Sequence, residues 1–378
     1  MIIKNGLLLN DHFVFEPAEI AFEKEILAIG KNLSGGETID AKGGYVLPGF
    51  VDIHMHAAVG RAFMEGDPEA IRQICLFEAS RGTTTLVPAI EGAPSEIMER
   101  QIRLVASEAE KPAEDQARIM GIYLEGPFFS KTYRGGFPEA CLRNPDPEEM
   151  ERLCSAGNGL VKVVSMAPEL EGALPMIRSL TKRGITVSLG HTAATCEEAK
   201  KGFEAGAACV THMFNAMSPM HHREPGMAGA AMAAPGISCE LIGDLFHVHP
   251  EVIRILYKLK GKDEIILISD AERGTGMPDG EYIDNGVRVI VQDGKTYTED
   301  HVIYGSTITL LDAVKNLHSL GSPLNEVVKM ASFNPAVAAG IASYTGSLTC
   351  GKYADILILD QNLNLQTVIL GGNISFSA

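Results

Sequence analysis

Two histidines separated by one residue form the first candidate for metal chemistry. In the segment DIHMH, residues 52–56, the alternation of an extended chain places His54 and His56 on one face and Met55 on the other. Two imidazoles on one face are a common half of a metal site. The alternative is a pair of hydrogen-bonded surface histidines, so the motif indicates a metal site without establishing one.

Three more candidate ligands each follow a short apolar stretch. Glu125 ends the run YLE and precedes Gly126-Pro127, a turn that would fix the direction of a carboxylate able to bridge two metals. His191 and His212 each close a β-like run. One such residue alone is usually a solvated side chain, a helix cap or a structural histidine. Together, and beside an H-x-H pair, they favour a metal site.

A sixth candidate, Asp270, follows the apolar run IILIS of residues 265–269. An ionised carboxylate at the end of so apolar a strand must be compensated, and a metal or a metal-bound water is a natural partner. The alternative is an N-cap for the segment that follows.

The elements that must position these residues alternate between short apolar runs and longer amphipathic stretches. The predicted strands are Phe50–Ile53, Thr84–Pro88, Ile119–Leu124, Val161–Ser165, Thr186–Leu189, Cys209–His212, Cys239–Ile242 and Ile265–Ser269. The predicted helices are Pro68–Arg81, Pro94–Glu110, Pro147–Cys154, Leu174–Lys182, Thr195–Ala205 and Pro250–Leu259. This alternation fits an α/β fold of the (β/α)8 TIM-barrel type, whose strands all end on the side that carries the active site. A doubly wound open sheet is the alternative.

Both ends of the chain are predicted to be β structure. Residues 1–48 hold short apolar stretches separated by turn signals, and residues 346–360 indicate two short strands joined by a turn. Between them we expect strands at Gly286–Val291 and Lys295–Glu299 and helices at Thr309–Leu320 and Leu324–Phe333. The terminal segments suggest one small accessory domain in which the two ends meet.

Charge and composition exclude several classes of partner. The 378 residues include 48 Asp and Glu against 32 Lys and Arg, a net charge of −16, which opposes binding to nucleic acid or to an anionic membrane surface. No secretory signal and no apolar run long enough to span a membrane are visible, so we expect a soluble, cytoplasmic protein. The seven scattered cysteines form no C-x-x-C pair, which is typical of free thiols in a reducing compartment.

Seven motifs together resemble one known family over essentially the whole chain. They are PGFVDIHMH from Pro48, YLEGPF from Tyr123, GHTAAT from Gly190, THMFNAMSPMHHREPG from Thr211, FHVHP from Phe246, SDAERGTG from Ser269 and YGSTITL from Tyr304. The chain resembles the N-acetylglucosamine-6-phosphate deacetylases of the metal-dependent amidohydrolase superfamily. The long motif from Thr211 is the most specific, whereas PGFVDIHMH alone indicates only the superfamily.

The resemblance implies both a domain plan and a metal site. It implies a (β/α)8 barrel over residues 49–339, a small β-sandwich domain formed by residues 1–48 and 340–378, and a homodimer. Glu125, His191 and His212 would hold one divalent metal. His54, His56 and Asp270, sharing Glu125, would hold a second. Zinc is the preferred metal, but Fe, Mn, Co and Ni also accept this mixture of ligands.

The implied reaction is hydrolysis of the acetamide of an N-acetyl amino sugar 6-phosphate, with N-acetylglucosamine 6-phosphate as the preferred substrate. The metal would supply a hydroxide, and Asp270 would take the proton of the water and deliver it to the leaving amine. His247 would polarise the acetyl carbonyl. For His249, a role at the entry of the helix that begins at Pro250 is an equal alternative to one in the site.

The implied substrate contacts come from several loops. They are Gly136, Asn215, Ala216, His247, Ile303, Tyr304 and Gly305. Arg223 would reach the phosphate bound by the neighbouring subunit, a task suited to a bidentate donor. The alternative for Arg223 is a surface ion pair with Glu224 or another carboxylate.

The sugar-facing residues depart from the family pattern while the metal set is intact. Phe137 stands where the family has a His or Gln that touches the phosphate, and Ala57-Ala58 stands where it has Gly-Gly. Leu245-Phe246 and Tyr304 add bulk beside the sugar site. Alternatives therefore stay open: an N-acetylgalactosamine 6-phosphate or unphosphorylated sugar, a cyclic-amide or N-acyl-amino-acid substrate, or a barrel without catalysis that serves in binding.

Overall fold

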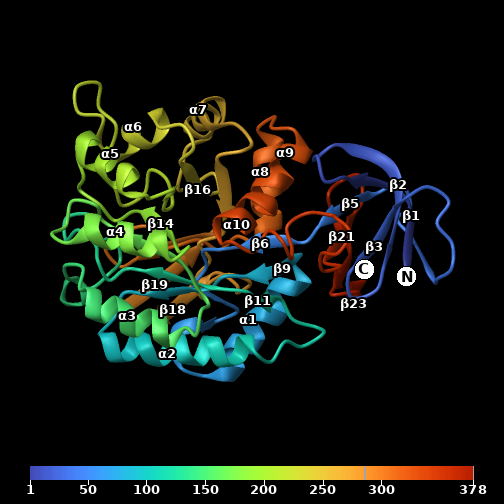
Figure 1. The fold of residues 1–378 in the computed structure, drawn as a ribbon, viewed down its shortest axis with the longest axis horizontal. Helices are drawn as coiled ribbons and strands as arrows, with labels where there is room; N and C mark the ends of the chain where they lie inside the picture. The colour runs from blue at the N-terminus through green and yellow to red at the C-terminus, as the bar shows by residue number, and fades with distance from the viewer. Residues whose placement is uncertain (285–286, 378) are drawn as a thin grey trace.

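The protein consists of a barrel surrounded by helices and a β-sheet beside it that contains both ends of the chain (Figure 1). The structure, a computed structural model, describes residues 1–284 and 287–377. Within these ranges no helix combines the length and the apolar character needed to cross a bilayer.

Parallel strands form the barrel, in the orders β11-β9-β6 and β10-β12-β13-β14-β15-β16-β17. Their bounds are β6 (Phe50–Asp52), β9 (Thr83–Leu86), β10 (Ala89–Glu91), β11 (Arg118–Ile119), β12 (Ile122–Glu125), β13 (Val161–Met166), β14 (Thr186–Leu189), β15 (Cys209–Val210), β16 (Ser238–Ile242) and β17 (Ile265–Ile268). The first and last strands meet where the Asp270 N–H donates to the His54 carbonyl at 2.9 Å. The predicted (β/α)8 barrel is therefore confirmed, and the alternative prediction of a doubly wound open sheet is wrong.

Two of the predicted barrel strands are each interrupted. The second strand position is divided into β9 and β10, because Pro88 has no N–H to donate to the ladder. The third is divided into β11 and β12 around Met120 and Gly121. The prediction of single continuous strands at these two positions was wrong, although their place in the barrel was right.

Helices follow most barrel strands. Where a helix was predicted, its two ends are correct to within two residues. They are α1 (Pro68–Ser80), α2 (Ser95–Ala109), α3 (Pro147–Ala156), α4 (Ala173–Lys182), α5 (Cys196–Ala205), α6 (Gly226–Ala233), α7 (Pro250–Lys260), α8 (Leu310–Ser319), α9 (Leu324–Ala331) and α10 (Phe333–Ala338). Short 3-10 turns lie at Phe63–Glu65 and Glu139–Cys141. The single helix expected over Leu324–Phe333 is wrong in extent, since the helix ends before Ser332 and α10 follows. Pro335 cannot donate to the Ala331 carbonyl, so one helix cannot continue through this point.

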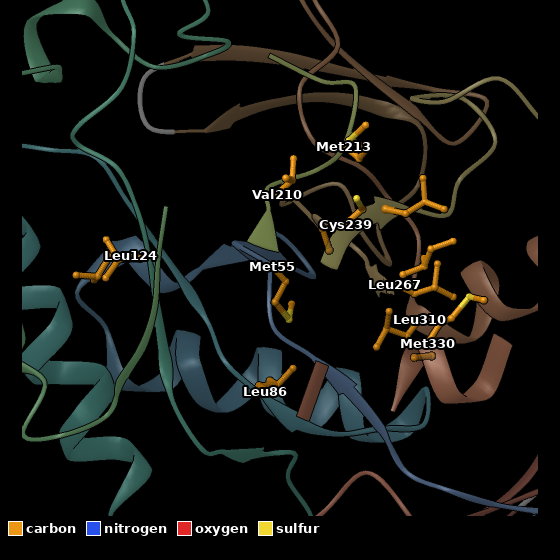
Figure 2. Packing of buried hydrophobic residues seen from close by; sticks show 14 of the residues in the cluster. Met55, Leu86, Leu124, Val210, Met213, Cys239, Leu267, Leu310 and Met330 are labelled. Atoms are coloured by element: carbon orange, nitrogen blue, oxygen red, sulfur yellow. The ribbon is translucent and has the colours of Figure 1, made fainter. Parts of the chain in front are cut away.

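The alternation predicted for the barrel strands is visible in the core. Met55, Leu86, Leu124 and Leu267 belong to the hydrophobic cluster between the barrel and its helices, and Figure 2 shows Leu267 beside Leu310 and Met330 of α8 and α9. Residues at alternate positions point into the barrel, where Val51, Ile53, Tyr123, Val163, Cys209 and Ile266 form a second cluster. Each strand thus presents one face to the helices and the other to the barrel interior.

Strands from both termini form one sheet, seen on the right of Figure 1, in the order β23-β22-β21-β5-β1-β2-β3, with β4 beside β1. Their bounds are β1 (Ile2–Leu9), β2 (Phe15–Phe22), β3 (Ile26–Gly30), β4 (Thr38–Asp40), β5 (Tyr45–Pro48), β21 (Ile356–Leu359), β22 (Leu365–Leu370) and β23 (Asn373–Ser377). The two ends of the chain meet where β5 pairs antiparallel with β21. The domain boundaries at residues 48 and 340 stay a prediction.

The expected pair of strands within residues 346–360 is wrong. Only β21 forms there among the described residues, and its hairpin partner β22 follows it. The segment before β21 turns at Gly351, whose φ of 85° ends any extended run, and it buries Leu348 and Ala354 without a ladder.

A smaller antiparallel sheet lies between β17 and α8 in the chain. It contains β18 (Gly280–Asp284), β19 (Val287–Gln292) and β20 (Lys295–Thr298), and a short hairpin of β7 (Ala57–Ala58) and β8 (Arg61–Ala62) lies near the first barrel strand. The predicted strand at Gly286–Val291 is confirmed from Val287 onward, and Gly286 lies outside the described residues.

A buried carboxyl on α1 predicts how stability changes with pH. Glu78 is fully buried, and burial together with the charge of Asp52 raises its pKa to about 8. Between pH 5 and 8 the unfolded chain loses this proton while the folded chain keeps it, so the free energy of unfolding falls as pH rises, by at most about 5 kcal/mol from this group. Chemical denaturation at pH 5 and at pH 8 should therefore show a smaller fall for Glu78→Gln than for the wild type. Glu96→Gln, at an exposed position of α2, is the control, and an unchanged pH dependence in Glu78→Gln would contradict the assignment.

Candidate metal centre and substrate pocket

The six predicted ligands lie together at the carboxyl ends of the barrel strands. His54 and His56 follow β6, Glu125 ends β12, His191 follows β14, His212 follows β15 and Asp270 follows β17. All six are buried, and Asp270, the most exposed of them, has 8% of its surface accessible. The barrel topology thus brings together residues that lie up to 216 positions apart in the chain.

Three of these strand ends turn sharply. His191, His212 and Asp270 have φ values of 46°, 25° and 49°, in the left-handed region that side chains other than glycine rarely adopt. Each such residue costs on the order of 1 kcal/mol or more, and such strain is concentrated at functional sites. Here each strained residue is itself a candidate ligand and lies where the chain turns away from its strand.

The first set of ligands is formed by Glu125, His191 and His212. The Oε1 atom of Glu125 lies 3.1 Å from His191 Nε2 and 3.2 Å from His212 Nε2, and the two Nε2 atoms are 3.0 Å apart. His191 Nδ1 lies 3.0 Å from the Tyr133 carbonyl, which only accepts, so Nδ1 carries the hydrogen and Nε2 of the neutral ring has a lone pair. Burial lowers the pKa of His191 and favours this neutral form.

The second set shares the same carboxylate. His54 Nε2 lies 3.4 Å from Glu125 Oε1 and 3.6 Å from Asp270 Oδ1. His56 Nε2 lies 3.4 Å from Glu125 Oε2 and 3.2 Å from Asp270 Oδ1. Glu125 is therefore within 3.4 Å of all four imidazole rings, as a carboxylate shared by two metal positions would be.

The charges of the site are strongly coupled. Burial alone would lower the pKa of His56, but its hydrogen bond to Asp270 and the charge of Glu125 raise it to about 9. Burial would likewise raise the carboxyl pKa values, but the histidines hold the pKa of both Glu125 and Asp270 below the ordinary range. Bound cations would take over this compensation from protons, so metal binding should release protons.

The residues present fit a divalent metal. His191 Nε2, His212 Nε2 and Glu125 Oε1 converge within 3.2 Å of one another, and a cation between them would satisfy all three. The fully buried His54 Nε2, which faces Glu125 and Asp270, has no hydrogen-bond partner among the described residues. Two groups, His54–His56–Glu125 and Glu125–His191–His212, have their ligand atoms within 4.8 Å of one another. Mixed imidazole and carboxylate ligands suit several first-row transition metals, zinc among them.

A cavity of about 770 Å³ opens above these ligands. Its lining includes every predicted site residue except His54, which is buried beneath it, and Arg223. The predicted residues in the lining are His56, Glu125, Gly136, His191, His212, Asn215, Ala216, His247, Asp270, Ile303, Tyr304 and Gly305. Arg223 lies in an exposed loop, where its Nη1 atom is 2.7 Å from His222 Nε2.

The two histidines of the FHVHP segment separate into different roles. His247 lines the cavity, and its Nδ1 lies 2.6 Å from Asp244 Oδ2. Asp244 also accepts the backbone N–H of His247 at 2.9 Å, so the ring is held at two points. His249 instead begins α7 by accepting the Glu251 N–H at 3.2 Å, which decides its open assignment in favour of helix entry.

Aromatic side chains close one wall of the cavity. Phe129 stacks on His191 with ring centroids 4.4 Å apart, and Phe137 meets the same ring edge-on at 5.1 Å. Phe137, at a position where the family has a polar residue, thus packs against a candidate metal ligand. On the same side, a side chain at Gly136 would meet Tyr304 at 2.8 Å, so the close approach of this loop requires glycine there.

Three acidic residues in or beside the cavity were not predicted from the sequence. Glu91 ends β10 directly opposite Glu125 in the strand register, and Glu272 lies two residues beyond Asp270. With His56 they form a third group of possible ligands. Glu91 lies three residues beyond the predicted strand Thr84–Pro88, so the pattern did not mark it as a strand-end residue. Asp244 was also not predicted, although an acidic residue three positions before His247 could have indicated the partner of that histidine.

A profile of the Amidohydrolase family matches residues 45–375. The chain belongs to the amidohydrolase family. Members of this family depend on metals, in agreement with the ligand groups of the barrel.

Relatives within the amidohydrolase family are sugar-phosphate deacetylases. The chain is 35% identical to an N-acetylglucosamine-6-phosphate deacetylase of Vibrio furnissii over 88% of its length and 83% of that protein. It is 34% identical to an N-acetylgalactosamine-6-phosphate deacetylase of Escherichia coli O157:H7 over 87% of both chains. It also superimposes with a TM-score of 0.92 and 30% identity on a mutant N-acetylglucosamine-6-phosphate deacetylase of Mycobacterium smegmatis in complex with N-acetylglucosamine 6-phosphate, covering 100% of this chain and 99% of the other. The family predicted from the motifs is thereby confirmed.

The shared position of Glu125 predicts how metal content responds to substitution. Glu125→Ala should lose both ions, because this carboxylate contacts all four rings, whereas His56→Ala should lose only one. Elemental analysis after dialysis against saturating zinc measures the ions per chain. Tyr304→Phe, in the cavity but outside the ligand groups, should keep the wild-type content. A wild-type protein with one ion per chain would contradict the shared site.

Proposed function

We propose that the chain hydrolyses the acetamide of an N-acetyl amino sugar 6-phosphate, with N-acetylglucosamine 6-phosphate as the first candidate substrate and glucosamine 6-phosphate and acetate as products. The observation that carries this proposal is the packing of Glu125 against four buried imidazoles, with Asp270 beside them, at the floor of a sugar-sized cavity. The related deacetylase complex with N-acetylglucosamine 6-phosphate supports the substrate.

The residues that would hold metal are Glu125, His191 and His212 for one ion and His54, His56, Asp270 and the shared Glu125 for a second. A divalent ion bound by such ligands lowers the pKa of a water molecule to about 7 and polarises a carbonyl oxygen. Zinc is the metal we propose.

Asp270 is the proposed general base and acid. It lies at the floor of the cavity, where its carboxylate would accept a proton from the attacking water. The same proton can then pass to the sugar nitrogen, which leaves poorly as an amide anion.

His247 is the proposed donor to the acetyl carbonyl. Its Nδ1 is engaged by Asp244, which leaves Nε2 as the ring atom available to a ligand in the cavity. When the ring carries hydrogens on both nitrogens, Nδ1–H donates to Asp244 and Nε2–H can donate to the carbonyl oxygen as negative charge develops on it.

The sugar and its phosphate would lie against the loops of the cavity wall. Gly136, Asn215, Ala216 and the segment 303–305 are the proposed contacts. We further propose a homodimer in which the exposed Arg223 reaches the phosphate bound by the neighbouring subunit. The free state of all seven cysteines supports a cytoplasmic location.

N-acetylgalactosamine 6-phosphate is the second candidate substrate. It is favoured by the similarity to the Escherichia coli O157:H7 enzyme, which nearly equals that to the Vibrio furnissii enzyme. The altered wall formed by Phe137 and Tyr304 is the part of the cavity that would distinguish the two sugars.

Substitution of the proposed base tests the mechanism. Asp270→Asn should lower kcat by about 10²- to 10⁴-fold, the usual contribution of general acid–base catalysis, since an amide cannot take the proton. Steady-state acetate release measures this, and metal analysis should show that at least one ion remains. A variant that keeps most of its activity would remove Asp270 from this role.

A substrate panel tests the function itself. Acetate and free amine should be released from N-acetylglucosamine, N-acetylgalactosamine or N-acetylmannosamine substrates, with the 6-phosphate form preferred.

Arg223→Ala should reduce kcat/KM for the phosphorylated sugar at least tenfold more than for the unphosphorylated one, because the guanidinium would contact only the phosphate. Equal losses would assign Arg223 a structural role, and no release from any sugar would contradict the proposed function.

A further inference from the structure

A buried carboxylate that is not among the proposed metal ligands lies directly behind one of them. Glu240, in the middle of β16, points into the barrel and has no accessible surface. Its Oε2 atom lies 2.9 Å from Nδ1 of His54, which is equally buried. This is the edge of the His54 ring opposite the one that faces the candidate metal centre.

This contact fixes the tautomer of His54. A carboxylate only accepts, so Nδ1 must carry the hydrogen of the bond. Nε2 of the neutral ring then carries the lone pair, and it is the atom that faces Glu125 at 3.4 Å and Asp270 at 3.6 Å. A carboxylate behind a ligating histidine both orients the ring and makes the ligand nitrogen more basic.

The same carboxylate also holds the strand end that bears His212. Oε2 accepts the His212 backbone N–H at 3.3 Å, and the Glu240 carbonyl accepts the Met213 N–H at 2.7 Å. Both donors are main-chain N–H groups, so the contacts of Glu240 with this strand end do not include the His212 ring. Only the second ligand set has a ring that Glu240 contacts directly.

A purely structural role explains Glu240 poorly. Removing a carboxylate from water is costly, and a well-packed apolar residue in its place is often neutral or stabilising. Among the described residues, its carboxylate oxygens contact His54 Nδ1, the His212 N–H and the weak donor Cys209 Sγ at 3.8 Å, and no Lys or Arg. A carboxyl group at this depth, with the His54 ring as its closest side-chain partner, therefore indicates a requirement of the site above it.

We propose that Glu240 is a positioning residue that fixes His54 for the second metal, and that without it the chain would hold that ion weakly while keeping the first. The inference rests on the proposed two-metal function. It assigns the ability to hold two ions to a side chain that belongs to neither ligand set.

The test is a titration of the metal-free chain with zinc ions alone. Calorimetry measures the binding steps, and a competing chelator in the solution brings tight binding into the measurable range. The wild type should show two binding steps. Glu240→Gln keeps the volume of the side chain and an accepting oxygen but removes the charge, and it should weaken the second step by about 10- to 100-fold while changing the first by less than threefold. His54→Gln should lose the second step. Glu78→Gln, which is equally buried on α1, is the matched control and should retain both steps.

Each other outcome has a definite meaning. Two unchanged steps in Glu240→Gln would overturn the inference and leave the two-metal function intact. Equal weakening of both steps would show a general structural role and also overturn it. A single step in the wild type would overturn the two-metal function and this inference with it. A thermal melt of each metal-free variant confirms that it is folded before the titration.

Discussion

The structure of the active end of the barrel depends on one buried carboxylate. Glu125 lies within 3.4 Å of four imidazole rings, which come from the ends of three different strands. A charge at this depth is tolerated only when it is closely compensated. The eight strand positions, their common direction and the left-handed turns at His191 and His212 together place the compensating groups around it.

The surroundings of this carboxylate differ on its two sides. Below it, Glu240 and Tyr123 contact the His54 ring inside the barrel, so this ligand has little freedom to move. Above it, a cavity opens whose wall includes Phe137 and Tyr304. In the proposed function, the reaction type would depend on the lower part with its six candidate ligands, and the choice of substrate would depend on the upper part.

Sequence reasoning located much of the site because barrel geometry converts a simple pattern into proximity. A polar residue after an apolar strand must lie at the same end as the others, and the alternation around Met55 placed His54 and His56 on one face. The side chains that support the ligands were not found in this way. Glu240 lies within an apolar strand, and its role depends on contact with His54, 186 positions away, which no local pattern reveals.

The errors in secondary structure also have physical causes. Pro88 interrupts the strand ladder within residues 83–91, and Pro335 cannot donate to the Ala331 carbonyl at the break between α9 and α10. The helix α6 was missed because its run of Gly, Ala and Met has no polar face and therefore no amphipathic period. The segment before β21 packs Leu348 and Ala354 into the core of the terminal sheet, and burial alone does not make a strand.

The central claim is that Glu125 is a carboxylate shared by two metal ions. Anomalous diffraction at the zinc edge, from crystals of the wild-type protein grown with zinc, tests it most directly. The account predicts two peaks, one on each side of the Glu125 carboxylate, with His191 and His212 around one and His54 and His56 around the other at about 2.0–2.2 Å. A single peak, or zinc bound away from Glu125, would contradict it.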